Sequence, residues 1–119
     1  AIVASLASFI GLPQSAAYNA SKAAVRVWGE SLRLSERRNG VEINVVCPGF
    51  VVSRMTARNK FPMPFLMSAE RASAIIRRGL ERNKARIAFP LGTKAAVWLG
   101  ITLPGSWTDR LMQSGMRKQ

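Results

Sequence analysis

The order of segments in this sequence predicts an α/β fold built around a parallel sheet. Short apolar segments typical of strands alternate with longer segments typical of helices, in the order strand, helix, strand, helix, strand. The segment VEINVVC at 41–47 is apolar along nearly its whole length, as expected of a strand buried on both faces. Strands joined in this way run parallel, and the connections between them are right-handed.

The first half of the chain contains the first strand and the longest helix. Residues 2–5, IVAS, resemble the end of a buried strand, and Gly11 and Pro13 then indicate a loop. The segment 15–38 contains no proline and is rich in Ala, Leu, Arg and Glu, which favours a helix. The Asn-Gly pair at 39–40 is typical of a helix end.

The second half of the chain repeats this pattern. Pro48 and Gly49 interrupt the strand at 41–47, and a loop follows as far as Met67. A helix with Ser68 as its N-cap is expected over 68–83. The apolar face of this helix is expected to consist of Ala72, Ile75, Ile76 and Leu80. A short strand follows at 85–90, then a short apolar helix at 93–103 and a basic tail.

The composition excludes several kinds of site. The 119 residues contain no histidine, so a Ser-His-Asp triad is excluded, and we expect no zinc or other metal site. The single cysteine, Cys47, cannot form an internal disulfide and is interpreted as a small, buried, inert thiol. The longest uncharged apolar run near the C-terminus, AAVWLGITLPG, is too short to span a bilayer.

The strong positive charge has several interpretations. Eighteen Lys and Arg stand against six acids, which gives a net charge of +12. The partner of such a surface is nucleic acid, an anionic membrane or an anionic ligand. The aromatic residues are not interleaved with the basic ones, as a base-stacking surface requires, so we expect no nucleic acid. Acidic residues in another part of a longer protein would balance the charge, so the charge alone identifies no function.

The stretch SAAYNASKAA carries the only tyrosine of the chain among small residues. Tyr18 and Lys22 are four positions apart, so they share one face near the start of the expected helix. The ammonium and the positive end of the helix dipole both favour the phenolate, which makes the phenol a usable proton donor and acceptor. Ser5 follows the first strand, at the edge where parallel sheets bind ligands, and can hydrogen-bond the same substrate oxygen. The three residues together predict interconversion of a carbonyl and an alcohol.

Four motifs occur in a fixed order along the chain. They are S-x-A at Ser5, G-x-P at Gly11, Y-N-A-S-K-A-A at Tyr18 and P-G-F-V-x-S at Pro48. The set closely resembles the short-chain dehydrogenase/reductase family, by motif to about residue 55 and by element order to about residue 90. The resemblance implies an α/β fold, the C-terminal portion of a Rossmann-like doubly wound parallel sheet with three strands and two to four helices. The catalytic motif and substrate loop would occupy 1–90, and an apolar and basic helical extension would occupy 91–119.

The resemblance also implies roles for individual residues. Tyr18 would be the general acid in reduction and the base in oxidation. Lys22 would favour the phenolate and hydrogen-bond the nicotinamide ribose, and Ser5 would orient the substrate carbonyl. The cofactor would be NADP or NAD. Besides Tyr18 and Lys22, the residues expected to contact it are Pro48, Gly49, Val51 and Ser53, the last in the place of the usual threonine.

Other parts of the family pattern are absent from this sequence. It contains no G-x-x-x-G-x-G fingerprint, no Asn-Ala-Gly segment and no catalytic Asn upstream of Ser5. We therefore expect the C-terminal half of such an enzyme, and expect the 119-residue chain alone to bind NAD(P) poorly and to be inactive. The alternative is a non-catalytic basic module of the same fold, which binds a membrane surface or nucleic acid or serves as a scaffold.

Two apolar segments bear on the substrate and on partners. The segment 54–68 occupies the place of the family's substrate loop, and its apolar residues are Met55, Phe61, Met63, Phe65, Leu66 and Met67. We expect a small hydrophobic carbonyl or alcohol substrate, with packing of the loop onto the sheet as an equal alternative. The segment 93–119 combines Trp98 and Trp107 with basic residues, so a subunit contact is expected, with peripheral membrane contact as the alternative.

The small-residue face of the helix at 15–38 bears on assembly. In the family the corresponding helix commonly pairs subunits, so the resemblance implies a homo-oligomer through this helix. With one cysteine and no visible secretory signal, we expect a cytoplasmic protein, with a membrane-peripheral location as the alternative.

Overall fold

The computed structural model describes residues 1–60 and 62–116. Within them the chain forms a three-stranded sheet in the order β1-β2-β3, with both pairs of strands parallel. The strands are β1 (Ile2–Val3), β2 (Val45–Pro48) and β3 (Arg86–Phe89). Val45 is the register partner of Ile2 on one side and of Arg86 on the other. The predicted α/β class and the parallel sheet are therefore confirmed.

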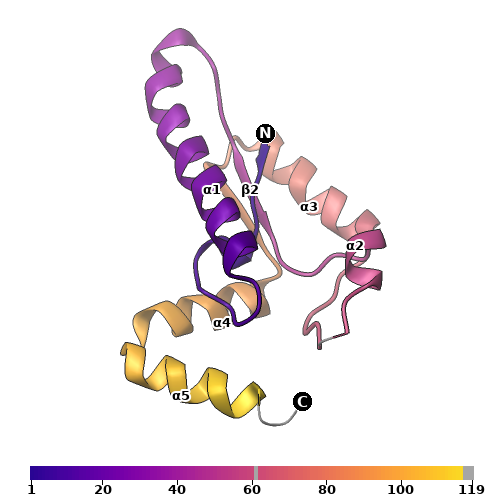
Figure 1. Ribbon diagram of the computed structural model, residues 1–119. Coiled ribbons are helices and arrows are strands. Elements are labelled where there is room, and N and C mark those ends of the chain that lie inside the picture. The colour runs from indigo at the N-terminus through magenta and orange to yellow at the C-terminus, as the bar shows by residue number, and fades with distance from the viewer. Residues whose placement is uncertain (61, 117–119) are drawn as a thin grey trace.

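Five α-helices and two short 3-10 helices connect and flank these strands over the described residues (Figure 1). In chain order they are η1 (Leu6–Ser8), α1 (Ala16–Glu36), η2 (Arg37–Asn39), α2 (Arg54–Ala57), α3 (Ala69–Glu81), α4 (Leu91–Thr102) and α5 (Gly105–Met116). The expected range of two to four helices was exceeded because a single turn, α2, forms inside the expected loop. The basic tail also forms a helix of its own, α5.

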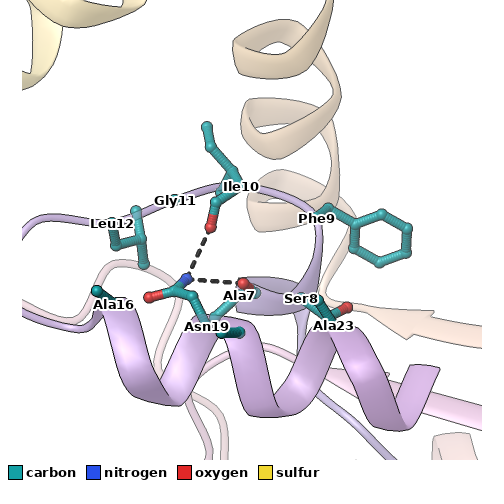
Figure 2. A pocket seen from close by; sticks show the side chains of 10 residues that line it. Ala7, Ser8, Phe9, Ile10, Gly11, Leu12, Ala16, Asn19 and Ala23 are labelled. Atoms are coloured by element: carbon teal, nitrogen blue, oxygen red, sulfur yellow. Dashed lines mark hydrogen bonds between the residues drawn. The ribbon is translucent and has the colours of Figure 1, made fainter. Parts of the chain in front are cut away.

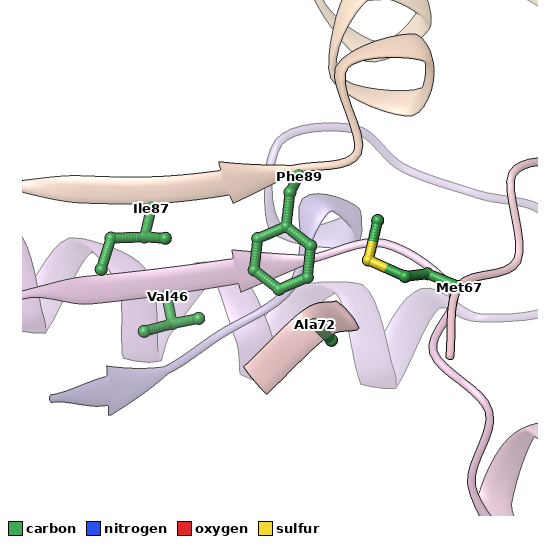
Figure 3. Packing of buried hydrophobic residues seen from close by; sticks show 5 residues of the cluster. All are labelled: Val46, Met67, Ala72, Ile87 and Phe89. Atoms are coloured by element: carbon green, nitrogen blue, oxygen red, sulfur yellow. The ribbon is translucent and has the colours of Figure 1, made fainter. Parts of the chain in front are cut away.

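Two hydrophobic clusters fill the two sides of the sheet. The cluster on the side of α3 consists of Val46, Met67, Ala72, Ile87 and Phe89 (Figure 3). The cluster on the side of α1 consists of Ala4, Leu6, Val45 and Cys47. Neighbouring residues of a strand point to opposite faces. Because Val45 and Val46 belong to different clusters, α1 and α3 must cover opposite faces of the sheet.

Helix α1 confirms the long helix predicted over 15–38. It ends at Glu36, and η2 adds a tighter turn as far as Asn39. Gly40 then has a φ of 75°, in the left-handed region where a side chain is strained. The glycine stop predicted at 39–40 is therefore confirmed.

Helix α3 begins as predicted but turns a different residue towards the sheet. The Ser68 Oγ accepts a hydrogen bond from the backbone N–H of Arg71 over 3.3 Å, which confirms the N-cap. The placement of Leu80 in the apolar face is wrong, because Leu80 is 37% exposed. Gly79 is buried instead, and a Cβ on it would lie 2.6 Å from the side chain of Ile87. The helix therefore lies so close to β3 that the position facing Ile87 has room only for glycine.

The strands are shorter than the apolar segments that predict them. In the segment expected as 2–5, β1 consists of Ile2 and Val3, and the Ala4 N–H still donates a hydrogen bond to the Val46 carbonyl over 2.8 Å before Ser5 caps η1. Residues 41–44 of the segment expected as 41–47 precede β2, although the Asn44 carbonyl still accepts a hydrogen bond from the Ile2 N–H over 2.8 Å. The strand expected at 85–90 is observed as β3.

A polar network fastens the amino edge of the sheet, the end where the parallel strands begin. The Asn44 Nδ2 donates hydrogen bonds to the Asn83 Oδ1 over 3.0 Å and to the Lys84 carbonyl over 2.8 Å. Arg33 of α1 donates to the Asn83 carbonyl over 3.1 Å and lies 3.6 Å from the carboxylate of Glu42. The network joins α1, the start of β2 and the turn that leads into β3.

The contact of Gly79 with Ile87 predicts a stability effect. In Gly79→Ala the new Cβ collides with a buried side chain, and overpacking of this kind costs about 1–3 kcal/mol. The gain in helix propensity offsets about 1 kcal/mol of that cost. We expect a net loss in the free energy of unfolding, measured by urea titration. The same replacement at Gly105, where a Cβ meets no atom within 4 Å, is the control and should not destabilise.

Candidate active site

The carboxyl edge of the sheet, where β1 and β2 end, brings Ser5 beside Pro48. The Ser5 Oγ donates a hydrogen bond to the Pro48 carbonyl oxygen over 3.5 Å. This length is at the limit of a hydrogen bond, so the hydroxyl can exchange the carbonyl for a ligand oxygen with little loss. Because β1 and β2 run parallel, the residues that follow them, Ser5 among them, lie at the same edge as Pro48.

The turn that follows β1 fixes the orientation of Ser5. Ser5 is the N-cap of η1, and its Oγ accepts a hydrogen bond from the Ala7 N–H over 3.1 Å. The residue is only 9% exposed. A serine hydroxyl has one proton and two acceptor sites, so this cap leaves the proton available for a substrate oxygen.

Tyr18 and Lys22 lie one turn apart near the start of α1. Tyr18 is 41% exposed, and the Lys22 Nζ lies 5.9 Å from the centroid of its ring. The same Nζ donates a hydrogen bond to the Val3 carbonyl over 3.5 Å. Because Val3 is the last residue of β1, this contact sets the ammonium between the phenol ring and the carboxyl edge. The arrangement therefore brings a phenol, an ammonium and, two residues beyond Val3, the hydroxyl of Ser5 to one region.

The turn after β2 carries the other predicted cofactor contacts, and its polar groups bond to β3, to Met67 and to neighbouring residues of the turn. The Gly49 N–H donates to the Phe89 carbonyl over 2.7 Å, and Val51 forms an isolated parallel bridge with Met67. Ser53 caps α2, because its Oγ accepts from the Thr56 N–H over 3.2 Å and its own N–H donates to the Thr56 Oγ1 over 2.8 Å. These contacts hold the turn against β3 and against the segment that precedes α3.

Asn19 is a site residue that the sequence reasoning did not identify. It follows Tyr18 directly and is only 6% exposed. Its Nδ2 donates two hydrogen bonds, each of 2.7 Å, to the carbonyl oxygens of Ala7 and Ile10 (Figure 2). The signal in the sequence was a lone amide within a run of alanines on the helix, YNASKAA, where a polar residue has to find buried partners.

A groove of about 390 Å³ lies beside Asn19, between residues 7–12 and α1. On the helix side it is lined by Ala16, Ala20 and Ala23, whose short side chains leave the space open. Figure 2 labels two of these residues, Ala16 and Ala23. In Figure 2 the Asn19 Oδ1 points away from the two hydrogen bonds, towards Ala16 and Leu12. The small residues around the Tyr-Lys motif therefore border the loop after Ser5.

Phe9 holds the other side of this loop through a charged cluster. The guanidinium carbons of Arg26 and Arg86 lie 4.3 and 4.9 Å from the centroid of the Phe9 ring. Glu30 pairs with both arginines, at 3.0 Å from the Arg26 Nη1 and in a close contact with Arg86. The cluster joins the loop after η1 to α1 and β3, and each cation–π contact of this kind contributes about 0.5–1 kcal/mol.

Cys47 lies in β2 beneath these groups and is fully buried. Burial raises the pKa of its thiol, and the nearby charges of Arg86 and Arg26 only partly oppose that rise. A buried thiol with a raised pKa is a weak nucleophile at neutral pH. The interpretation of Cys47 as a buried residue is therefore confirmed.

The apolar residues of the expected substrate loop are partly buried in the core and partly exposed. Met67 is only 6% exposed and belongs to the cluster on the side of α3. Met55, Phe65 and Leu66 are exposed, at 66%, 59% and 46%. Phe61, which was also expected in the apolar set, lies outside the described residues.

Two kinds of feature are absent from the part of the chain that the structure describes. It contains no group of three or more His, Cys, Asp or Glu side chains that could hold a metal ion. None of its helices combines the length and the apolar character needed to cross a membrane.

The sheet with helices on both faces and the polar groups at its carboxyl edge define a doubly wound α/β protein. The profile of the short chain dehydrogenase family matches residues 1–62 of the chain, which therefore belongs to this family. The chain is 42% identical over 107 residues to an uncharacterized oxidoreductase of Myxococcus xanthus, and 36% identical over 90 residues to one of Mycobacterium tuberculosis. The matches cover 90% and 75% of this chain but only 42% and 35% of those relatives.

Solved structures share the fold. A short-chain dehydrogenase from Sphingobium yanoikuyae, in complex with NADPH, superposes with a TM-score of 0.67 and 22% identity, over 93% of this chain and 43% of that one. An acetoin dehydrogenase from Enterobacter cloacae superposes with a TM-score of 0.62 and 18% identity, over 79% and 42% of the two chains. At these identities the likeness is one of fold. It confirms the Rossmann-like portion that the resemblance implies.

Proposed function

We propose that the protein is an NAD(P)-dependent oxidoreductase that interconverts a carbonyl and a secondary alcohol. The observation that supports this most is the gathering of Ser5, Tyr18 and Lys22 about the end of β1. The Lys22 ammonium contacts both the phenol ring of Tyr18 and the last carbonyl of β1. Membership of the short chain dehydrogenase family supports the same reaction class.

The residues at the carboxyl edge fit the nicotinamide end of a dinucleotide. The Tyr18 hydroxyl and the Lys22 ammonium are hydrogen-bond donors at an accessible position, and ribose hydroxyls and a carboxamide oxygen accept such bonds. Pro48 at the end of β2, and Gly49, Val51 and Ser53 in the turn beyond it, would line the other side. When bound, the nicotinamide supplies or accepts the hydride.

The chain's own residues would handle the proton. In reduction the Tyr18 hydroxyl donates its proton to the carbonyl oxygen as the alcohol forms, and in oxidation the phenolate takes that proton back. Lys22 places its positive charge beside the Tyr18 ring, and its contact with the Val3 carbonyl holds the ammonium at the end of β1. Ser5 donates a hydrogen bond to the same oxygen, which orients the carbonyl and stabilises its developing charge.

The substrate class follows from the exposed part of the segment 54–68. Met55, Phe65 and Leu66 offer apolar surface beyond the carboxyl edge, and methionine adapts to ligands of different shape. We therefore propose a small hydrophobic carbonyl or alcohol as substrate. Peripheral membrane contact through 93–119 stays a prediction; Trp98, Leu99 and Trp107 of that segment are exposed, and residues 117–119 lie outside the described part.

A homo-oligomer through α1 is also proposed. The face of α1 turned away from the sheet exposes Val27, Trp28 and Leu34, at 55%, 59% and 81%. Exposed apolar side chains on one helix face favour burial against a second copy of that face, as a two-fold interface requires.

Replacing Tyr18 by Phe tests the proton-transfer role. In the protein as expressed from its own gene, we expect Tyr18→Phe to lower kcat by about 100-fold or more, because only the proton donor is lost. Binding of NADH or NADPH, measured by fluorescence, should persist. The control is Ser35→Ala, which removes a hydroxyl further along the same helix and should leave turnover unchanged. Turnover of Tyr18→Phe within a few-fold of the unmodified protein would contradict the assignment.

A series of aldehydes from butanal to decanal tests the substrate class. With an apolar binding surface, kcat/KM should rise with chain length, because each buried methylene contributes about 0.8 kcal/mol. Met55→Ser should flatten this rise without changing kcat/KM for butanal. A kcat/KM that does not depend on chain length would indicate that the apolar loop residues only pack.

Replacing Trp28 by Glu tests the proposed assembly. A charge in the middle of an apolar interface should dissociate it, so Trp28→Glu should sediment as a smaller species than the unmodified protein. Val41→Glu is the control, because Val41 is 48% exposed and lies beyond the end of α1. A monomeric unmodified protein, or equal sedimentation of all three, would refute an interface on α1.

A further inference from the structure

We propose that Asn19 is a positioning residue for Ser5, because it ties the turn that carries Ser5 to the helix that carries Tyr18. This role rests on the proposed function. Neither the Tyr-Lys motif nor the position of Ser5 after β1 predicts this role. The motif describes only α1, and the position of Ser5 describes only the turn after β1, whereas Asn19 connects the two.

A short series of hydrogen bonds links Ser5 to Asn19, the residue next to Tyr18. The Ser5 Oγ accepts a hydrogen bond from the Ala7 N–H over 3.1 Å, and the carbonyl of the same Ala7 accepts one from the Asn19 Nδ2 over 2.7 Å. Asn19 is joined to Tyr18 by a peptide bond. Residue Ala7 therefore holds Ser5 with its N–H and is itself held by α1 through its C=O.

The second hydrogen bond of Asn19 makes this tie rigid. The Ile10 carbonyl accepts from the same Nδ2 over 2.7 Å, so the amide spans the loop from Ala7 to Ile10 (Figure 2). Both partners are carbonyl oxygens, which accept but do not donate, so the nitrogen must face them and the amide has one orientation. A side chain with a single donor cannot serve both carbonyls in this way.

The surroundings of Asn19 strengthen its effect on the loop. The residue is only 6% exposed, so water does not compete for these bonds. Phe9 lies between the two tied carbonyls and is held from the other side by Arg26 and Arg86. Of these two contacts with the loop, the one through Asn19 leads directly to Tyr18.

The catalytic consequence is one of geometry. Ser5 and Tyr18 must address the same substrate oxygen, and a misplacement of about 1 Å can lower a rate by about 100-fold. Loss of the tie would let Ser5 move relative to Tyr18 while both side chains remain. We therefore expect a lower kcat with little change in KM, because the substrate's apolar contacts are unaffected.

The experiment compares Asn19→Ala and Asn19→Ser with Asn44→Ala in the protein as expressed from its own gene. Asn44 is the matched control, because it is 7% exposed and its Nδ2 also donates two hydrogen bonds, at the opposite edge of the sheet. The readouts are amide hydrogen exchange of residues 7–12, far-UV circular dichroism, and kcat and KM with the most active aldehyde of the series. The serine variant keeps one donor and is the test of the role if the alanine variant does not fold.

We expect Asn19→Ala to speed amide exchange in 7–12 and to lower kcat by about 100-fold with KM changed less than a few-fold. The exchange rate and the kcat of Asn19→Ser should lie between those of Asn19→Ala and the unmodified protein, and Asn44→Ala should change neither the exchange in 7–12 nor kcat. Unchanged exchange in 7–12 for the Asn19 variants would refute the tie. Faster exchange with an unchanged kcat, or an equal loss of kcat in Asn44→Ala, would refute the positioning role. An inactive unmodified protein would refute the proposed function and with it the catalytic part of this role, while the exchange data would still report on the tie.

Discussion

Complete burial of the first three residues of β2 is the constraint on which the rest of the structure depends. Val45, Val46 and Cys47 are all 0% exposed, so both faces and both edges of this strand must be covered. The alternation of side chains sends Val45 and Cys47 towards α1 and Val46 towards α3. Since β1 and β3 both run parallel to β2, the strand ends that carry Ser5 and Pro48 come to the same edge. The position of the candidate site is thus a consequence of how one strand is buried.

The polar groups of the site are held mainly by backbone atoms. Ser5 is oriented by Ala7, Lys22 contacts the carbonyl of Val3, and Asn19 binds two carbonyls of the loop after η1. Backbone groups are present whatever the side chain, so this framework does not depend on the identity of the loop residues. Phe9, held by two guanidinium groups, is the one side chain of the loop with a similar role.

Features set by local chemistry could be predicted from the sequence. The helix stop at Gly40, the Ser68 cap and the strand at 86–89 each depend on a few neighbouring residues, and all three are observed. Features set by packing between elements could not. Leu80 and Gly79 are equally compatible with the face of an isolated helix, and only the approach to Ile87 selects the glycine.

The same distinction applies to the candidate site. Its residue types and the adjacency of Ser5 to Pro48 followed from motifs and from the rule for parallel strands. The role of Asn19 did not, because its two partners are carbonyls nine and twelve residues away, and carbonyls have no signature in a sequence. The residues of the turn after β2 were assigned by resemblance, and their cofactor contacts stay predictions.

The network of Asn44, Asn83 and Arg33 at the amino edge separates the residues that stabilise the fold from the loops that determine ligand binding. It fastens α1, β2 and the turn before β3 at the end of the sheet that is remote from the candidate site. Selection can therefore alter the loops at the carboxyl edge, and with them the ligands that are accepted, without drawing on the contacts that keep the elements together. A scaffold fastened at one end in this way is free to diversify at the other.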